Sequence, residues 1–412
     1  KEHEDILEQA DETDAMFGEL YSWYLRNPEY RSRVQKLVQS AFAEKPEDII
    51  SQSVAKALYG EVSPYSATRL ERFAACAFAH FLQYGMKLTE RVEYEFKPMD
   101  MGNVMHEALE SFAEEVRKRG MKWTELTEQE RNEIADRCLD NIVADYGNTV
   151  LKSSARNEYM IERTRRILRR TVWALQKQLE QGEFQPEGFE VTFGGGRIDR
   201  VDIMEDQNKV YVKVIDYKTG NTSFDLVYLY HGLQLQLMIY LDGALRVEQK
   251  KYPDKEIIPA GVFYYNIKDP MIQEKIDADV EAVSAGLMKE LKMNGLVQAD
   301  PELVYRMDSS LGSIPVAFNK DGSFRKNSSV ADRTQFAVLG RYVRTKIEKI
   351  RSSILEGDAE VSPYELGKKN ACTYCPYMTV CGFDRRLSGY EFRRLKNFSD
   401  EELWKAFDRE AE

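Results

Sequence analysis

The sequence has no run of about 20 apolar residues, so we expect no segment that crosses a membrane. It has five cysteines in 412 residues, too few for a disulfide scaffold, and their clustered spacing favours a metal site in a reducing, cytoplasmic compartment. It contains no G-x4-G-K-[ST] pattern, so the chain should not hydrolyse ATP. The first residues are charged and helical in pattern, unlike a secretion signal, and the start at Lys1 leads us to expect a fragment of a longer protein.

The charge balance sets weaker limits. The formal net charge is −11, which argues against a general nucleic-acid coat protein. It does not exclude an enzyme that acts on nucleic acid, because the relevant charge is local. Basic residues gather at 163–170 and 385–396, where they form either solvated helix faces or a nucleic-acid contact.

Hydrophobic patterning divides the chain into an N-terminal segment and a large mixed domain. Residues 1–62 are acidic and helical in pattern, as expected for a helical linker or the tail of a preceding domain, and residues 63–412 carry the other elements. We expect helices at 67–85, from about 102, and at 125–183, 231–245, 279–296 and 331–355. We expect strands at 189–204, 209–220 and 257–267, and a polar, mobile loop at 300–330. This order predicts a mixed α/β core with large helical insertions.

The segment 210–218 offers the first catalytic candidates. Side chains alternate along a strand, so three valines share one face with Asp216 and Lys218. The valines anchor that face in the core, and Asp216 and Lys218 project together where the strand meets solvent. A carboxylate there can hold a cation, and a nearby ammonium can orient or activate an attacking water, as in hydrolysis at a bound metal.

Further candidate ligands lie on the preceding strand and on a helix. Asp199 and Asp202 differ in parity, so a regular strand cannot direct both at one site. One of them is a candidate ligand, and the other is a surface residue or a salt-bridge partner. Carboxylate oxygens suit a hard cation, Mg2+ or Mn2+. His106, four residues before Glu110 on a predicted helix, would add a nitrogen ligand that Mn2+ accepts.

Four of the cysteines form a second group. Cys372, Cys375 and Cys381 have the spacing C-x2-C-x5-C, and Cys76 lies far upstream, whereas Cys138 has the setting of an ordinary half-buried thiol. Four thiolates suit either Zn2+ or an iron–sulfur cluster, and their spacing alone does not decide between them. A site shared by residues so far apart would act as a clamp that closes the domain on itself.

Taken together, the motifs resemble the RecB-family branch of the PD-(D/E)xK nuclease superfamily. The resemblance rests on G-x3-H-x3-E at 102–110, GRID at 196–199, IDYK at 215–218 and Q-x3-Y at 236–240. It implies a restriction-endonuclease-like mixed sheet flanked by helices. Of the two candidate aspartates, Asp199 and Asp202, it also implies that Asp199 is the ligand.

The same resemblance implies a role for each residue of the motifs. His106, Asp199 and Asp216 would hold Mg2+ or Mn2+. Lys218 would be the catalytic lysine beside the two aspartates. Gln236 and Tyr240 would position the motifs or contact DNA.

A wider similarity covers residues 63–385, which resemble the nuclease part of AddB-type subunits of bacterial helicase–nucleases. It joins the cysteine pattern to the nuclease motifs, implies a 4Fe–4S cluster rather than Zn2+ on the four cysteines, and implies an AddA-like helicase–nuclease subunit as partner. Two features depart from the family pattern. Ala77 replaces the usual proline after the first cysteine, and the stretch EVTFGGGRIDR is short and glycine-rich.

The implied function is that of a metal-dependent DNA exonuclease domain. It would hydrolyse a single DNA strand within a helicase–nuclease complex of double-strand break repair and recombination. One alternative is a catalytically silent DNA-binding or docking module, whose basic clusters hold DNA without cutting it. The other is a stand-alone RecB-like nuclease of the CRISPR-adaptation type, although such chains are shorter and lack the long helical insertion at 120–185.

Overall fold

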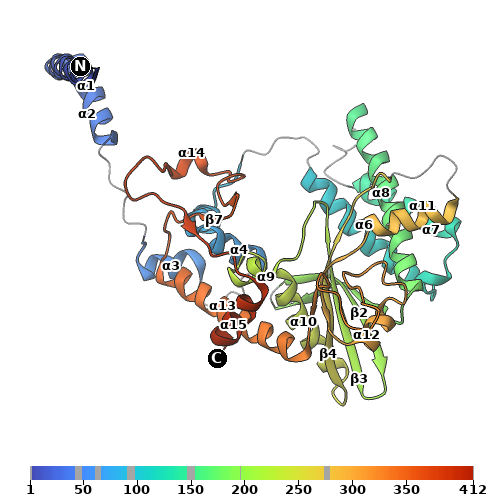
Figure 1. Cartoon of the computed structure of the whole chain (residues 1–412). Coiled ribbons are helices and arrows are strands. Elements are labelled where there is room, and N and C mark those ends of the chain that lie inside the picture. Colours follow the sequence, from blue (N-terminus) through green and yellow to red (C-terminus); the bar gives the residue numbers. More distant parts are fainter. Residues whose placement is uncertain are drawn as a thin grey trace.

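A six-stranded mixed sheet forms the centre of the molecule (Figure 1). The computed structural model describes residues 2–41, 49–60, 66–90, 98–145, 154–194, 196–272 and 279–411. The strands lie side by side in sequence order, and their bounds are β1 Gln185–Phe193, β2 Gly196–Asp206, β3 Lys209–Lys218, β4 Glu256–Asn266, β5 Asn294–Gln298 and β6 Val330–Ala331. β1, β2 and β3 run antiparallel, β3 and β4 are parallel, β5 is antiparallel to β4, and β6 is parallel to β5.

The first two strands differ from the expectation of one strand at 189–204. The chain reverses between Phe193 and Gly196, and β1 then pairs with β2 in a hairpin. Gly196 has a φ of 149°, a backbone conformation that would be strained for any residue with a side chain. The predicted strands at 209–220 and 257–267 are confirmed as β3 and β4.

One face of the sheet is covered by long helices. Their bounds are α6 Pro98–Lys118, α7 Glu128–Asp145 and α8 Ala155–Glu180, with a short 3-10 turn at Trp123–Glu125. α6 buries Met105, Leu109 and Phe112 at a spacing of three to four residues, which places them on one helix face. These side chains pack in one core with β-strand residues such as Ile215 and Phe263.

The opposite face packs against a second set of helices, which come from chain segments before the strands, between β3 and β4, and after the strands. Their bounds are α3 Gln52–Tyr59, α4 Ala67–Ala75, α9 Leu226–Tyr230, α10 Gln236–Lys251, α13 Arg333–Glu356 and α15 Asp400–Ala411. The valines at 210, 212 and 214 of β3 all belong to this core, as their shared parity predicts.

The predicted helix at 67–85 is interrupted at Cys76. This residue has extended backbone angles, φ −166° and ψ 117°, and it ends α4 and begins α5 Ala77–His80. A π-helical turn follows at Phe81–Gly85. The end at Gly85 agrees with the sequence-based expectation, but the break places Cys76 outside regular helix geometry.

Two other expectations are corrected. The segment at 279–296 holds only one helix, α11 Val280–Glu290, because Asn294–Gln298 joins the sheet as β5. The segment at 300–330 is not an irregular polar loop throughout. It contains α12 Pro301–Met307, and Ile314 and Val316 are buried in the core under the long helices.

The remaining elements lie near the ends of the chain. They are α1 Glu2–Arg26, α2 Pro28–Ala41, β7 Tyr364–Leu366, β8 Lys369–Asn370, α14 Met378–Cys381 and β9 Arg393–Arg394. Figure 1 shows α1 and α2 standing away from the sheet, at the blue end of the colour scale. The expected boundary between residues 62 and 63 lies outside the described residues. Within the described ranges, no helix combines the length and the apolar character that a membrane crossing requires.

Candidate active site

The candidate site lies at the end of β3, where two buried carboxylates come from neighbouring strands. Asp199 on β2 and Asp216 on β3 adjoin the paired residues Arg200 and Ile215, so they lie across from each other. Asp199 is 8% exposed and Asp216 is 1% exposed. The backbone N–H of Tyr217 donates to Asp199 Oδ2 at 2.7 Å and fixes that carboxylate.

His106 reaches the same place from α6, in the helical layer on the other side of the strands. Its Nδ1 lies 3.4 Å from Asp199 Oδ2 and its Nε2 lies 3.1 Å from the carbonyl oxygen of Tyr217. Burial alone would lower the pKa of His106, but hydrogen bonds with Asp199 and Glu190 and nearby negative charge raise it to about 10. The imidazole therefore sits in a strongly negative environment, which also suits a cation.

A third carboxylate, absent from the sequence-based prediction, joins this group. Glu190 of β1 places Oε1 3.8 Å from His106 Nδ1, and His106, Glu190 and Asp199 offer ligand atoms that all lie within 4.8 Å of one another. Asp216 is not part of this close group. Glu190 has a φ of 50°, unusual for a residue other than glycine, and its other oxygen pairs with Arg197 at 2.5 Å.

Lys218 holds the carboxylate that is left out of the close group. Its Nζ lies 2.6 Å from Asp216 Oδ2 and donates to Gln236 Oε1 at 2.8 Å. Burial and the neighbouring charge of Asp199 raise the pKa of Asp216, while Lys218 acts in the opposite direction. The Lys218 ammonium thus compensates the negative charge of Asp216, which would otherwise be buried next to that of Asp199.

The Q-x3-Y motif meets this lysine from the first turn of α10. Gln236 Nε2 donates to the hydroxyl of Tyr240 at 2.9 Å, while its Oε1 accepts from Lys218. Glu71 of α4 accepts hydrogen bonds from the backbone N–H groups of Leu235 and Gln236, at 2.7 Å and 2.9 Å. Sequence reasoning missed Glu71, because its only local signal is a charged residue next to an apolar one.

Asp202 lies on the opposite face of the sheet, as its parity requires. It is fully buried and forms ion pairs with Arg200 at 2.5 Å and with Lys213 at 2.9 Å. Arg200 also lies 5.6 Å from the centre of the Trp123 ring. Of the two expected roles for the second aspartate, Asp202 takes that of a salt-bridge partner, in the interior rather than on the surface.

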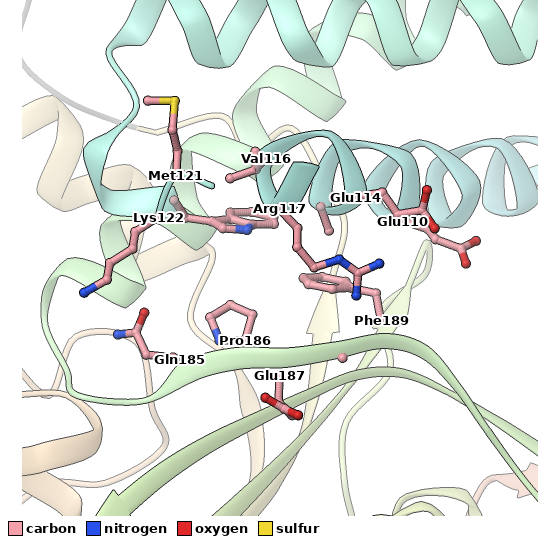
Figure 2. A pocket seen from close by; sticks show the side chains of 13 residues that line it. Glu110, Glu114, Val116, Arg117, Met121, Lys122, Gln185, Pro186, Glu187 and Phe189 are labelled. Atoms are coloured by element: carbon pink, nitrogen blue, oxygen red, sulfur yellow. The ribbon is translucent and has the colours of Figure 1, made fainter. Parts of the chain in front are cut away.

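A pocket of about 180 Å3 lies beside the site, between α6 and β1 (Figure 2). Glu110 lines it one helical turn beyond His106, and Phe189 lines it next to Glu190. Figure 2 shows Arg117 of α6 extending over the ring of Phe189, with Gln185 and Pro186 along the strand below. Because the two aspartates and the lysine do not line it, this pocket borders the candidate site and does not enclose it.

The four cysteines gather away from the sheet. Cys76 and Cys375 pack in one small apolar cluster with Leu82 and Tyr377. Burial and the charges of the other three thiols raise the pKa of Cys372 to about 11, so each of those three lies near enough to Cys372 to act on it electrostatically. All are free thiols, and no three described sulfurs lie within 4.8 Å of one another. The fifth cysteine, at position 138, lies apart in the core under α6.

Of the basic clusters, the one at 163–170 is largely neutralised by acidic neighbours. Arg165 pairs with Asp140 at 2.7 Å, and Arg169 pairs with Asp136. This cluster is therefore a weaker candidate for a DNA contact than its sequence suggests.

Comparison with known proteins agrees with these features. The chain is similar to the B-type subunit of the ATP-dependent helicase/deoxyribonuclease of Lachnoclostridium phytofermentans, with 41% identity over 97% of this chain and 36% of that protein. The proteins of the same name from Thermoanaerobacter sp. (strain X514) and Clostridium acetobutylicum are 34% and 33% identical, again over 97% of this chain. The chain thus spans little more than a third of the length of these relatives.

A family model covers most of the chain and includes every candidate residue of the site. The model of the PD-(D/E)XK nuclease superfamily matches residues 64–382. This range contains the sheet, the carboxylates of β2 and β3 at the candidate site, and the four gathered cysteines. The chain therefore belongs to the PD-(D/E)XK nuclease superfamily.

Proposed function

We propose that this chain is a divalent-metal-dependent deoxyribonuclease domain that hydrolyses phosphodiester bonds of a single DNA strand. The observation that carries the proposal is the arrangement at the end of β3. Two buried carboxylates, a histidine and a lysine from three separate elements meet there. Membership of a nuclease superfamily supports the assignment.

The donor set suits Mg2+ or Mn2+. Asp199, Asp216 and His106 would hold the ion, and Glu190 is placed to assist them. Oxygen ligands dominate, as hard cations prefer, and one imidazole is acceptable to Mn2+. A bound ion would polarise the scissile phosphate and stabilise the negative charge of the transition state.

The chain's own residues would do the rest of the chemistry. Lys218, released from Asp216 when a cation takes that carboxylate, would orient the attacking water and stabilise charge on the phosphate. Gln236 limits the positions of the ammonium through its 2.8 Å hydrogen bond. Tyr240 in turn fixes the amide of Gln236.

We infer that the domain works within a larger helicase–nuclease assembly. The relatives' name describes them as subunits of an ATP-dependent helicase/deoxyribonuclease. By this similarity the partner would be an AddA-like subunit, and the process double-strand break repair and recombination. Residues 1–62 would be the link to a preceding domain, although α3 within them already packs against α13, and its Ala55 and Tyr59 belong to the same core.

The four gathered cysteines would hold a 4Fe–4S cluster, with Zn2+ as the alternative. Their thiols are free and lie in one partly apolar region, which fits a thiolate-bound group. A tetrahedral zinc ion would bring all four sulfurs to within about 4 Å of one another, and no three of the described sulfurs lie within 4.8 Å of one another. Free thiols also fit the reducing cytoplasm, where we expect the protein.

The proposal is tested by cleavage of an end-labelled single strand of DNA. We expect cleavage that requires added Mg2+ or Mn2+ and stops with a chelator. His106→Gln should raise the metal concentration needed for half-maximal cleavage about 10- to 100-fold, because it removes one ligand. His231→Gln is the matched control, since the His231 ring hydrogen-bonds the Lys396 carbonyl and belongs to a different part of the chain.

Two results would contradict the proposal. One is metal-independent cleavage. The other is DNA binding without any cleavage, which would support the silent docking module instead.

Glu190 gives a separate prediction about metal binding. We expect Glu190→Gln to weaken Mn2+ binding about tenfold, since it removes a carboxylate near His106 and Asp199. Titration of Mn2+ followed by electron paramagnetic resonance measures this directly. Glu187→Gln is the control, because Glu187 lies on the same strand and pairs with Lys251 instead. Equal Mn2+ affinity of the Glu190 variant and wild type would show that Glu190 is not a ligand.

A further inference from the structure

Glu71 is a half-buried carboxylate that the proposed chemistry does not use. It lies on α4, and it accepts hydrogen bonds from two backbone N–H groups at the start of α10. Within the described chain, Leu235 precedes the first turn of α10 and supplies no capping side chain. The first N–H groups of a helix have no partner within the helix, so Glu71 supplies a cap from a separate element.

The capped residue is the one that holds the lysine of the candidate site. Gln236 is the first residue of α10, and its side chain lies between Lys218 and Tyr240. A shift of its backbone would move the Oε1 atom that accepts from Lys218. Three successive polar contacts therefore connect Glu71 to Asp216: from Glu71 to the Gln236 backbone, from Gln236 to Lys218, and from Lys218 to the carboxylate.

The other end of α4 is attached to residues 360–397, which carry Cys372, Cys375 and Cys381 and are called the cysteine segment below. Cys76 directly follows α4, and the N–H of Phe78 donates to the carbonyl of Glu360 at 3.0 Å. The guanidinium of Arg393 donates to the carbonyl of Ala74. α4 is thus fixed between the cysteine segment and the start of α10.

We propose that Glu71 is a positioning residue that couples the cysteine segment to Lys218, through α4 and the first turn of α10. The proposal rests on the proposed nuclease function for its kinetic consequence only. Its structural part, the fixing of Leu235 and Gln236 by Glu71, stands without it.

Two substitutions separate the acceptor from the charge. Glu71→Gln keeps an oxygen that can accept both N–H groups, whereas Glu71→Ala removes it. We expect the neutral oxygen of the glutamine to keep both hydrogen bonds, because burial already disfavours the charged form of Glu71. Burial raises the pKa of Glu71 to about 7, and the hydrogen bonds from the Gln236 and Leu235 N–H groups act in the opposite direction. Asp300→Ala is the matched control, because Asp300 accepts from two backbone N–H groups at the start of another helix, α12.

Hydrogen exchange of the folded chain tests the structural part. In Glu71→Ala, amide exchange at Leu235 and Gln236 should become at least tenfold faster, and in Glu71→Gln it should stay within about threefold of wild type. Asp300→Ala should leave these amides unchanged. Unchanged exchange in Glu71→Ala would overturn the proposal even if the chain cleaved no DNA.

Kinetics test the consequence for the site. Glu71→Ala should lower kcat by a factor of about 10 to 100, with the KM for DNA and the Mn2+ affinity unchanged, because His106 and Asp199 keep their contacts. Glu71→Gln should restore most of the rate. Equal losses in the two variants, or a loss of Mn2+ affinity, would overturn the positioning role.

A double variant tests the coupling to the cysteines. Cys375→Ala should also speed exchange at Leu235 and Gln236. If α4 carries that effect, Cys375→Ala and Glu71→Ala together should speed exchange by much less than the product of their separate factors. Independent, multiplicative effects would exclude the coupling.

Discussion

Lys218→Met is expected to slow cleavage of single-stranded DNA by a factor of about 10^2 to 10^4 while the chain stays folded. The substitution keeps an unbranched apolar side chain and gives up the ammonium's position over the ring of Tyr264, 5.5 Å from its centre. It removes the ammonium that lies 2.6 Å from Asp216 and 2.8 Å from Gln236. The charge that would stabilise the phosphate and orient the water is lost, and single-turnover cleavage measures the loss.

The metal affinity of the same variant separates catalysis from metal binding. Lys218 repels a cation at Asp216, so Lys218→Met should bind Mn2+ as tightly as wild type or more tightly. Asp216→Asn should lose both cleavage and affinity. Lys209→Met, at the exposed start of the same strand, is the control and should retain the wild-type rate. A Lys218→Met rate within about twofold of wild type would rule out the assigned role.

Loss of a single cysteine of the proposed clamp should destabilise the C-terminal segment severely. Cys375→Ala is expected to reduce the free energy of unfolding by about 2–5 kcal/mol, comparable with the loss of a native crosslink. The reason is the local structure, because the fully described range 360–397 contains only the short elements β7, β8, α14 and β9. Urea unfolding measures the change, and visible absorption of the same samples reports an iron–sulfur cluster.

Cys138→Ala is the matched control for this experiment. Cys375 is a half-buried free thiol, whereas Cys138 is a buried free thiol that packs in the core under α6, apart from the other four. Cys138→Ala should lower the free energy of unfolding by only about 1 kcal/mol, the cost of a small cavity, and should leave the visible absorption unchanged. If Cys375→Ala were as stable as wild type, the four gathered cysteines would not act as a clamp. A colourless wild type that contains bound zinc would replace the cluster with Zn2+.

The central strands and their parity could be predicted from the sequence because strand periodicity is local. The alternation at 210–218 placed Asp216 and Lys218 on one face, and the structure has them there in an ion pair. The parity argument also separated Asp199 from Asp202. Which of the two joins His106 was implied only by the family resemblance, and the distances agree with it.

The parts that could not be predicted depend on contacts between distant segments. Glu190 reaches His106 only because β1 and β2 form a hairpin. The sequence pattern predicted a single strand across the glycine-rich stretch and therefore did not reveal this hairpin. Glu71 meets α10 across 164 residues of chain, and no local pattern reports such a contact. The segment at 300–330 was expected to be irregular since its composition is polar, yet tertiary packing buries part of it.

The buried ion pairs of Asp202 have a consequence for the fidelity of the sheet. A slip of one residue in the pairing of β2 with β3 would exchange the two faces of β2. It would turn Asp199 toward the core under α6, α7 and α8 and bring Asp202 toward α10. Asp202 would then be separated from Lys213, and both charges would stay buried without partners. Misaligned pairings are thereby penalised during folding. The Arg200–Asp202–Lys213 group, on the face of the sheet opposite the candidate site, thus favours the one pairing of β2 with β3 that places Asp199 beside Asp216.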